Sequence, residues 1–474
     1  MKVGRIILVA LFGILVLNSC QDDLDDNINN ANNSANQLSI KDFIWKAMNT
    51  FYVYKGDSPN LANDRFDSNE AYREFLESID SPINFFDALL ADQDRFSFIV
   101  PDFVTLELNQ DGISLSNGMA FGFVQFRGTE TVFGFVKYVV PGSPAENAGL
   151  ERGMIFTSID GTAFTPQTNF GQLISPDSYT IGLAEFQGSE LVNLDQQVSL
   201  DKIQLTENPI HEHKVLNVDG QKVGYLMYNN FRSPFNSELN GVFANFKAEG
   251  ISELVLDLRY NSGGSIETCK DLSSMITGQF NGQVFAQQLF NDNFEPENLI
   301  FDSEISSGET INSLNFSRVF VLTSESSASA SELLINALNP YIDVVQIGTN
   351  TEGKFEGSAT LYDSPNFRRN EASLEHTYAI QPLILKTANK DGFTDFFEGL
   401  PPDIKQQEIF QNLGVLGDPS ETLLNKALQV ISPGFEPSST SEIKSIYDIE
   451  MLGEDQMNLP TYQKMYIHPE ILKF

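Results

Sequence analysis

Apolar residues recur every three or four positions between residues 40 and 90, a spacing typical of amphipathic helices. After Arg95 the pattern changes to short runs rich in β-branched and aromatic residues, each bounded by glycine, proline or aspartate. From Gln221 onward, strand-like and helix-like stretches alternate, as parallel α/β units require. The pattern therefore predicts a small helical unit, a β unit and an α/β unit, in that order along the chain.

The alternation after Gln221 is regular enough to place individual elements. We expect strands at 223–228, 254–258, 319–323 and 344–348, and helices at 237–247, 266–277 and 330–338. In the earlier β unit we expect strands at 121–126, 132–140 and 155–159. Residues 435–474 are polar with scattered apolar anchors, and we expect a tail that packs only in part.

Length and composition narrow the class of protein. A chain of 474 residues is long enough for two to four domains, and 41% hydrophobic with 20% charged residues is typical of globular proteins. The net charge of −35 argues against nucleic-acid binding as the main activity, because it repels a phosphate backbone. Two cysteines cannot form a disulfide framework, and Cys269 is expected to be a buried apolar residue. His211 and His213 lack an evident third ligand, so we expect no metal and no cofactor.

The first twenty residues have the pattern of a leader peptide. Lys2 and Arg5 precede an apolar stretch from Ile6 to Leu17, which is too short to span a bilayer. The ending Leu17-Asn18-Ser19-Cys20 resembles the lipobox of bacterial lipoproteins, which implies cleavage before Cys20 and acylation of its thiol. An ordinary secretory leader is the alternative.

Residues 21–37 are polar and acidic, with too little apolar surface to fold, and we expect a flexible tether. Acidic residues directly after a lipidated cysteine resemble a surface-export signal of lipoproteins from Bacteroidetes, although a solvated linker explains them equally well. The expected location is the cell envelope, and both the cell surface and the periplasmic face stay open.

Residues 141–161 carry a second pattern. Ser143-Pro144-Ala145 and Ala148-Gly149-Leu150 precede a predicted strand that ends at Asp160-Gly161, which resembles the signature of bacterial PDZ domains. Met154 departs from it, because aspartate usually stands there. Upstream lies a glycine-rich run with the shape of a loop that captures a chain-terminal carboxylate through backbone N–H groups. This run consists of Gly118, Met119, Ala120, Phe121, Gly122 and Phe123. A structural spacer with an unused groove is the alternative.

Two segments carry candidate anion-binding geometry. Segment 256–265 runs from a buried strand into Gly263 and Gly264, and paired glycines allow backbone N–H groups to point toward negative charge. Segment 321–334 is a strand, a serine-rich turn and a helix, so a hydroxyl at the turn lies beside unpaired N–H groups and the positive end of the helix dipole. A tight turn without a ligand and a plain helix N-cap are the alternatives.

Segment 347–357 places a single lysine, Lys354, in a glycine-flanked loop. A solvated lysine has a pKa near ~10.4 and is a poor base at neutral pH. A lysine packed among apolar neighbours loses its proton more readily and can act as a base. Lys354 is therefore either a catalytic base in a dry pocket or an ordinary surface residue.

Together these segments resemble the carboxy-terminal processing (tail-specific) serine peptidases, which use a Ser/Lys dyad. The resemblance implies that Ser329, the middle serine of Ser-Ala-Ser-Ala-Ser-Glu, is the nucleophile and that Lys354 is the general base. It also implies an oxyanion hole formed by the N–H of Ala330 and that of Gly263 or Gly264. Many members carry a glutamine four residues after the lysine, where this chain has Ser358, so Ser358 is the candidate for orienting the amine.

The resemblance implies an α/β multidomain fold, in which a ClpP/crotonase-like α/β catalytic core follows a PDZ-like β domain and a small N-terminal helical unit. The expected division is a signal peptide at 1–20, a tether at 21–37, a helical subdomain at 38–100, a PDZ-like domain at 105–200, a catalytic domain at 205–430 and a tail at 431–474. The implied function is a lipid-anchored serine endopeptidase that cuts polypeptide substrates near their C-termini. A catalytically inactive peptide-binding lipoprotein is the alternative, and an acyl-CoA enzyme on a related core would not need the PDZ-like domain.

Overall fold

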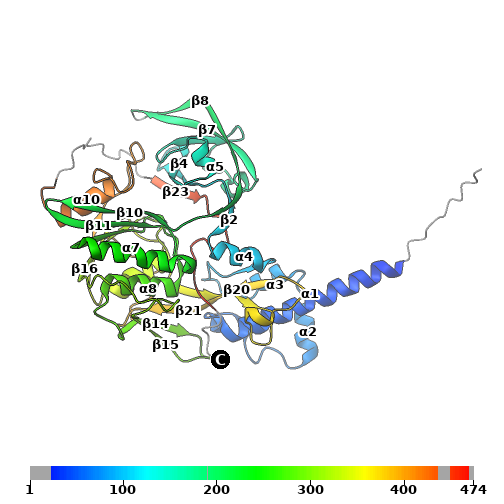
Figure 1. Ribbon diagram of the computed structural model, residues 1–474. Helices are drawn as coiled ribbons and strands as arrows, with labels where there is room; N and C mark the ends of the chain where they lie inside the picture. Colours follow the sequence, from blue (N-terminus) through cyan, green and yellow to red (C-terminus); the bar gives the residue numbers. More distant parts are fainter. Residues whose placement is uncertain (1–22, 189, 436–448, 469–474) are drawn as a thin grey trace, which may run out of the picture.

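The computed structural model describes residues 23–188, 190–435 and 449–468 (Figure 1). The predicted leader and its acylation site at Cys20 lie outside these residues. Among the helices in the described ranges, none is both long enough and apolar enough to cross a membrane.

The N-terminal unit is built around helix α1 (Asp23–Phe51), which packs against α2 (Asn69–Glu77) and α3 (Pro82–Asp87). Two short 3₁₀ helices follow α1, η1 (Lys55–Asp57) and η2 (Pro59–Leu61). The predicted helical unit is confirmed by these helices, and its apolar side chains are buried or half-buried. The prediction of a flexible tether is wrong for residues 23–37, whose backbone is helical. The second half of α1 is buried, and once a helix is nucleated there each further residue toward the N-terminus is added at little cost.

The predicted β unit forms a seven-stranded antiparallel sheet with the order β23-β3-β4-β5-β7-β8, in which β6 pairs with β5. Its strands are β3 (Met119–Phe126), β4 (Val132–Val139), β5 (Ile155–Ile159), β6 (Thr162–Ala163), β7 (Ser178–Gln187), β8 (Glu190–Asp201) and β23 (Ile449–Glu454). Short helices α5 (Pro144–Asn147) and α6 (Phe170–Leu173) accompany them. Helix α4 (Phe103–Gln110) and the pair β2 (Ile113–Ser116) and β9 (Ile203–Thr206) connect this unit to the rest of the chain.

The α/β unit contains a six-stranded sheet with the order β10-β11-β12-β16-β17-β22, parallel from β11 onward. Its strands are β10 (Ile210–Val218), β11 (Gln221–Tyr228), β12 (Glu253–Asp257), β16 (Arg318–Thr323), β17 (Asp343–Gly348) and β22 (Ile404–Lys405). Alternate strand residues point to opposite faces. Leu254 and Leu256 therefore pack with helices α7 (Asn236–Glu249), α8 (Ile266–Thr277) and α9 (Ala330–Leu338), whereas Val255 packs with α10 (Thr422–Ile431).

A second six-stranded sheet has the order β13-β24-β18-β21-β14-β15. Its strands are β13 (Gly264–Ser265), β24 (Met465–Ile467), β18 (Glu356–Ala359), β21 (Leu383–Ala388), β14 (Val284–Phe290) and β15 (Glu297–Ile300). A small sheet joins β1 (Phe98–Val100), β20 (Ala379–Gln381) and β19 (Leu361–Tyr362). The 3₁₀ helix η4 (Arg369–Glu371) lies between β19 and β20 in sequence, and η3 (Ser233–Phe235) directly precedes α7.

The C-terminal segment differs most from expectation. We expected a tail that packs only in part, but residues 449–467 supply β23 to the seven-stranded sheet and β24 to the interior of the second six-stranded sheet. Met465, Tyr466 and Ile467 are buried. These are apolar anchors of the segment, and backbone pairing on both sides of β24 satisfies its N–H and carbonyl groups in the interior.

Candidate active site

Ser329 lies in the turn between β16 and α9, as the serine-rich motif predicts. Its φ of +64° is a strained conformation for a residue other than glycine, and such strain is concentrated at functional sites. The side chain is fully buried, and no described residue forms a hydrogen bond with its Oγ. Ala330 is the first residue of α9, so its N–H has no acceptor within the helix. The turn thus presents an uncommitted hydroxyl beside a helix N-terminus.

Lys354 is also fully buried, in the loop between β17 and β18. Its Nζ donates a hydrogen bond to the carbonyl of Glu356 at 2.6 Å and lies 5.0 Å from the centre of the Phe96 ring. Burial lowers the pKa of Lys354 to about 8, although the carboxylates of Glu356 and Asp94 act in the opposite direction. A substantial fraction of the amine is therefore neutral near physiological pH.

The carboxylate of Glu332 connects the segments that carry the serine and the lysine. One oxygen, Oε2, accepts the backbone N–H of Ser329 at 2.7 Å and that of Lys354 at 2.9 Å. The other, Oε1, accepts the Gly353 N–H at 2.7 Å and the Thr351 hydroxyl at 2.6 Å. Burial raises the pKa of Glu332 to about 7 against these four donors. A single buried carboxylate thus holds the backbones of the two candidate catalytic residues close to each other.

Replacing Glu332 by glutamine is expected to lower both stability and activity. An amide has one acceptor oxygen, so two of the four donors lose their partner, at a cost of about 1–3 kcal/mol each. Denaturant unfolding and hydrolysis of casein, an unfolded protein, measure the two effects. Glu352→Gln is the matched control, because Glu352 lies in the same loop but forms a partly exposed pair with Arg95, worth less than about 1 kcal/mol. Equal losses in the two variants would contradict this role of Glu332.

The glycine pair lies directly against Ser329. A Cβ added to Gly263 would lie 2.7 Å from the Ser329 Cβ, so only glycine fits there. The Gly263 N–H donates to the Asn261 side chain at 2.9 Å, within its own loop. The Gly264 N–H instead donates out of the loop, to the carbonyl of Lys464 at 2.7 Å. Of the two expected oxyanion donors, Gly264 is thus the one that points away from its own loop.

Comparisons with known proteins bear on this arrangement. The family model described as peptidase family S41 matches residues 222–405, and the model of the peptidase S41 N-terminal domain matches residues 39–98. The chain belongs to peptidase family S41. The first match covers the segments that carry the glycine pair, Ser329 and Lys354, and the second covers the helical unit that supplies Phe96.

Individual S41 relatives are distant in sequence. A probable CtpA-like serine protease of Staphylococcus aureus (strain MRSA252) is 22% identical over 328 residues, which are 65% of this chain and 63% of that protein. The chain thus matches less than two thirds of that relative's length. A carboxyl-terminal-processing protease of Picosynechococcus sp. is 28% identical over 45% of this chain and 49% of its own length. The crystal structure of a putative S41 protease from Bacteroides fragilis superposes with a TM-score of 0.61 and 27% identity, and the match covers 82% of this chain and 96% of that chain.

Two predicted site features of this S41 chain have different partners from those expected. The Ser358 hydroxyl donates to the Met465 carbonyl at 2.9 Å and accepts from Gln381 at 2.8 Å, so its hydrogen bonds do not orient Lys354. The partner of the amine is the carbonyl of Glu356, the first residue of β18, two residues further along the chain. The reason is strand register, because Ser358 pairs with β24 and its side chain lies against that strand.

The glycine-rich run from Gly118 to Phe123 forms the start of β3 rather than an open loop. The N–H groups of Gly118 and Met119 are bound by side chains of their own turn. The N–H of Phe121 alone among these is bound by a carboxylate, that of Asp455, at 3.1 Å. The side chains of Met119, Phe121 and Phe123 lie in the core of the seven-stranded sheet.

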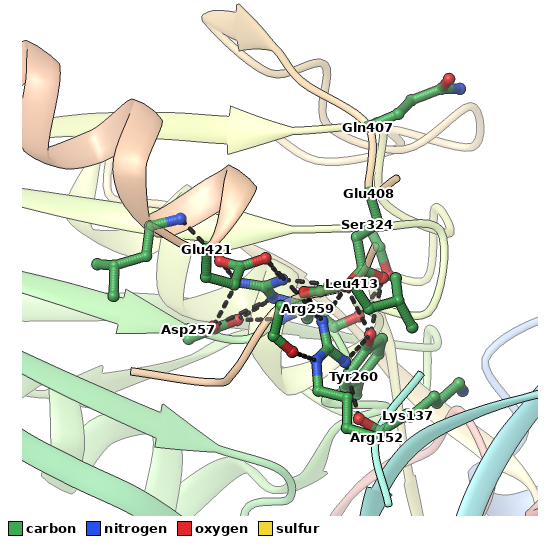
Figure 2. Close-up of polar contacts among 12 residues, drawn as sticks. Lys137, Arg152, Asp257, Arg259, Tyr260, Ser324, Gln407, Glu408, Leu413 and Glu421 are labelled. Atoms are coloured by element: carbon green, nitrogen blue, oxygen red, sulfur yellow. Dashed lines mark hydrogen bonds and ion pairs between the residues drawn. The ribbon is translucent and has the colours of Figure 1, made fainter. Parts of the chain in front are cut away.

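A buried ionic network holds the glycine loop in place (Figure 2). The Arg259 guanidinium, at the end of β12, donates to Asp257, Glu408 and Glu421. Arg152, from the seven-stranded unit, donates to Glu408 and to the Tyr260 hydroxyl. Burial would raise the pKa of Glu408, but the two arginines outweigh it and lower that pKa to about 2. The network therefore joins three distant segments beside the site.

Sequence reasoning missed several of these residues. The role of Glu332 has a sequence signal, since Ser-x-x-Glu at the start of a helix is a capping-box pattern. Phe96 and Lys464 have no such signal, because they come from distant segments. Cys269 is buried as expected, and its Sγ lies 3.2 Å from the Ala330 carbonyl.

Proposed function

We propose that the chain is a serine endopeptidase that cuts polypeptide substrates near their C-termini, with Ser329 as nucleophile and Lys354 as general base. The observation that carries the proposal is that two residues with a buried hydroxyl and a buried amine are held through their backbone N–H groups by one oxygen of Glu332. Membership of family S41 supports the reaction class, and the carboxyl-terminal-processing relative supports the substrate class. The presence of both Ser329 and Lys354 in the chain argues against the inactive scaffold.

In the proposed reaction, neutral Lys354 accepts the hydroxyl proton of Ser329 while Oγ forms a bond to the scissile carbonyl carbon. The resulting oxyanion is stabilised by the N–H groups of Gly264 and Ala330. The C–N bond then breaks, and the Lys354 ammonium returns its proton to the leaving amine. Water, deprotonated by Lys354, hydrolyses the acyl-enzyme and releases the new carboxylate.

The finer architecture belongs to the same proposal. We assign the two six-stranded sheets with α7, α8 and α9 to the expected ClpP/crotonase-like core, and the seven-stranded sheet to the expected PDZ-like unit, as part of this proposal. In such a unit an extended peptide adds a strand to a sheet edge. The lipobox-like ending at Cys20 supports a lipid anchor in the cell envelope.

The pH dependence of hydrolysis tests the proposed base. Because the pKa of Lys354 is lowered to about 8, kcat/KM for casein is expected to rise about tenfold per pH unit below pH 8 and to level off above it. Lys464→Met is the control, since it removes the second buried amine of the site, whose pKa is about 7. The limb near pH 8 should remain in that variant. Loss of this pH dependence in Lys464→Met, or a midpoint near the ordinary histidine pKa of ~6.5, would contradict the assignment of Lys354 as the base.

A further inference from the structure

The C-terminal segment of the chain, residues 449–467, passes through both places that the proposed function requires for substrate. Its strand β23 pairs antiparallel with β3, from Ile449 opposite Phe126 to Glu454 opposite Gly122. β23 thereby forms the edge of the seven-stranded sheet (Figure 1). Strand addition at a sheet edge is the way in which extended peptides bind such domains.

Asp455 continues this likeness to a bound peptide. Its side-chain carboxylate accepts the N–H of Phe121 at 3.1 Å, and its own N–H donates to the Phe121 carbonyl at 3.1 Å. Phe121 belongs to the glycine-rich run that the sequence assigned to carboxylate capture. The segment therefore delivers a carboxylate to this run.

About ten residues further on, the segment reaches the candidate catalytic residues. Strand β24 lies between β13, which contains Gly264, and β18, which follows Lys354, and it is parallel to both. The Lys464 carbonyl accepts the Gly264 N–H at 2.7 Å, the donor assigned above to the oxyanion. This carbonyl oxygen and the Ser329 Cβ lie 2.6 and 2.7 Å from the point that a Gly263 Cβ would occupy. A backbone carbonyl of the chain itself is thus placed at the nucleophile.

The Lys464 side chain occupies a defined subsite beside that carbonyl. Its Nζ donates to the Phe96 carbonyl at 2.6 Å and lies 5.0 and 5.4 Å from the centres of the Phe96 and Phe98 rings. Burial, and then the neighbouring Lys354, lower the pKa of Lys464 to about 7. Burial likewise raises the pKa of Asp455 to about 7. Burial of the charged forms of Lys464 and Asp455 is therefore unfavourable, and this desolvation cost weakens the binding of the segment to the site.

Glu454 anchors the segment between these two places. Its carboxylate accepts from Lys137 on β4 at 2.5 Å, from the hydroxyl of Tyr462 at 2.9 Å, and from the hydroxyl of Ser326 in the serine-rich turn. Glu454 is almost fully buried, whereas Glu450 on the same strand is exposed and lies 3.8 Å from Arg127.

We propose that residues 449–467 are an intramolecular substrate mimic, and that protein substrates bind by displacing this segment and following its path. A substrate would pair with β3 and, about ten residues later, enter between β13 and β18 with a long basic side chain against Phe96. The proposal rests on the proposed function, because it assigns the substrate path of the same site. While the segment occupies the site, substrate binds only to the chains in which the segment is displaced. The apparent Kd for substrate therefore equals the intrinsic Kd divided by the fraction of such chains.

Glu454→Lys in the full chain tests the displacement. The new ammonium faces Lys137 without a counter-charge, so it should release the segment, whereas Glu450→Lys makes the same charge change at an exposed position. We expect hydrolysis of casein to rise at least ~10-fold in Glu454→Lys and to stay at the wild-type rate in Glu450→Lys. Wild-type rates in both variants would overturn the proposal.

A binding measurement separates this proposal from the proposed function. In chains that also carry Ser329→Ala, fluorescence anisotropy reports the binding of a labelled synthetic peptide with the sequence of residues 449–468. We expect Kd to be at least ~10-fold lower with Glu454→Lys than without it. If the Kd values differ in this way but the chain with an intact Ser329 hydrolyses no casein, the substrate-mimic proposal is supported and the proposed peptidase function is refuted. If the chain with an intact Ser329 hydrolyses casein but the two Kd values are equal, the peptidase function is supported and the substrate-mimic proposal is refuted.

A reversible cross-link covers the case in which Glu454→Lys does not fold. Gln125 and Glu450 are direct partners across β3 and β23, so cysteines at both positions are close enough for a disulfide. The oxidised chain should lose at least ~10-fold in casein hydrolysis and regain it on reduction, while each single-cysteine variant should not respond. Equal activity of the oxidised and reduced double variant would show that the segment need not move, and would overturn the proposal.

Discussion

Replacing Ser329 by alanine is expected to reduce casein hydrolysis by at least ~10³-fold and to leave the folded structure intact. The Oγ is the only group that the mechanism allows to attack the carbonyl, so no other side chain takes over its role. Because no described residue forms a hydrogen bond with this oxygen, its removal leaves no buried partner unsatisfied. The thermal unfolding temperature should therefore equal or exceed that of the wild type, as measured by circular dichroism.

Ser331→Ala is the matched control for this result. Ser331 is buried two residues further along, and its hydroxyl donates to the Asn261 carbonyl at 2.9 Å. Its loss removes one hydrogen bond, worth about 0.5–1.5 kcal/mol, and should leave most of the activity. If Ser331→Ala abolished hydrolysis and Ser329→Ala did not, the nucleophile would be assigned to the wrong serine.

The parts of the fold that follow from local pattern could be predicted from the sequence. Helices at 266–277 and 330–338 have the expected bounds, and the parallel strands differ from expectation by one or two residues at most. The periodic apolar residues of a helix and its capping residues lie within a few positions of each other, so a short stretch of sequence is enough to predict the helix and its bounds. The burial of Lys354 could be predicted only from the family resemblance, because the residues of its own loop do not indicate which distant segments cover it.

The C-terminal segment could not be predicted for a physical reason. Strands β23 and β24 are short, six and three residues, and they pair with strands more than a hundred residues earlier. Such pairing leaves no periodic signal in the segment itself. The partner of Ser358 was missed with it, since the hydroxyl that was expected to orient Lys354 binds Met465 of β24 instead.

Replacing Arg259 by methionine is expected to lower the free energy of unfolding by about 3–5 kcal/mol, the usual cost of breaking a buried ionic network from one side. The guanidinium is fully buried, and its removal takes charged donors away from the buried carboxylates of Asp257 and Glu421. Asp257 keeps the Tyr225 hydroxyl and the backbone N–H of residue 259, whereas within the described ranges Glu421 keeps only the hydrogen bond from the Leu424 N–H for its two oxygens. Glu408 would keep only the Arg152 guanidinium and the Tyr260 hydroxyl. Denaturant unfolding followed by tryptophan and tyrosine fluorescence measures the loss.

The matched control is Arg318→Met on the neighbouring strand β16, where the guanidinium is partly exposed and pairs with Glu253, so the loss should stay below about 1 kcal/mol. The pH dependence identifies the cause. The folded-state pKa of Glu408 is lowered to about 2, so the stability that it contributes is present above its ordinary pKa of 4.5 and is lost as pH falls toward 2. Arg259→Met weakens that depression, and the gap between wild type and variant should therefore narrow as pH falls from 4.5 to 2. A gap that stays constant over this range would mean that Arg259 stabilises the fold by packing alone, and that the carboxylates beside the glycine loop do not depend on its charge.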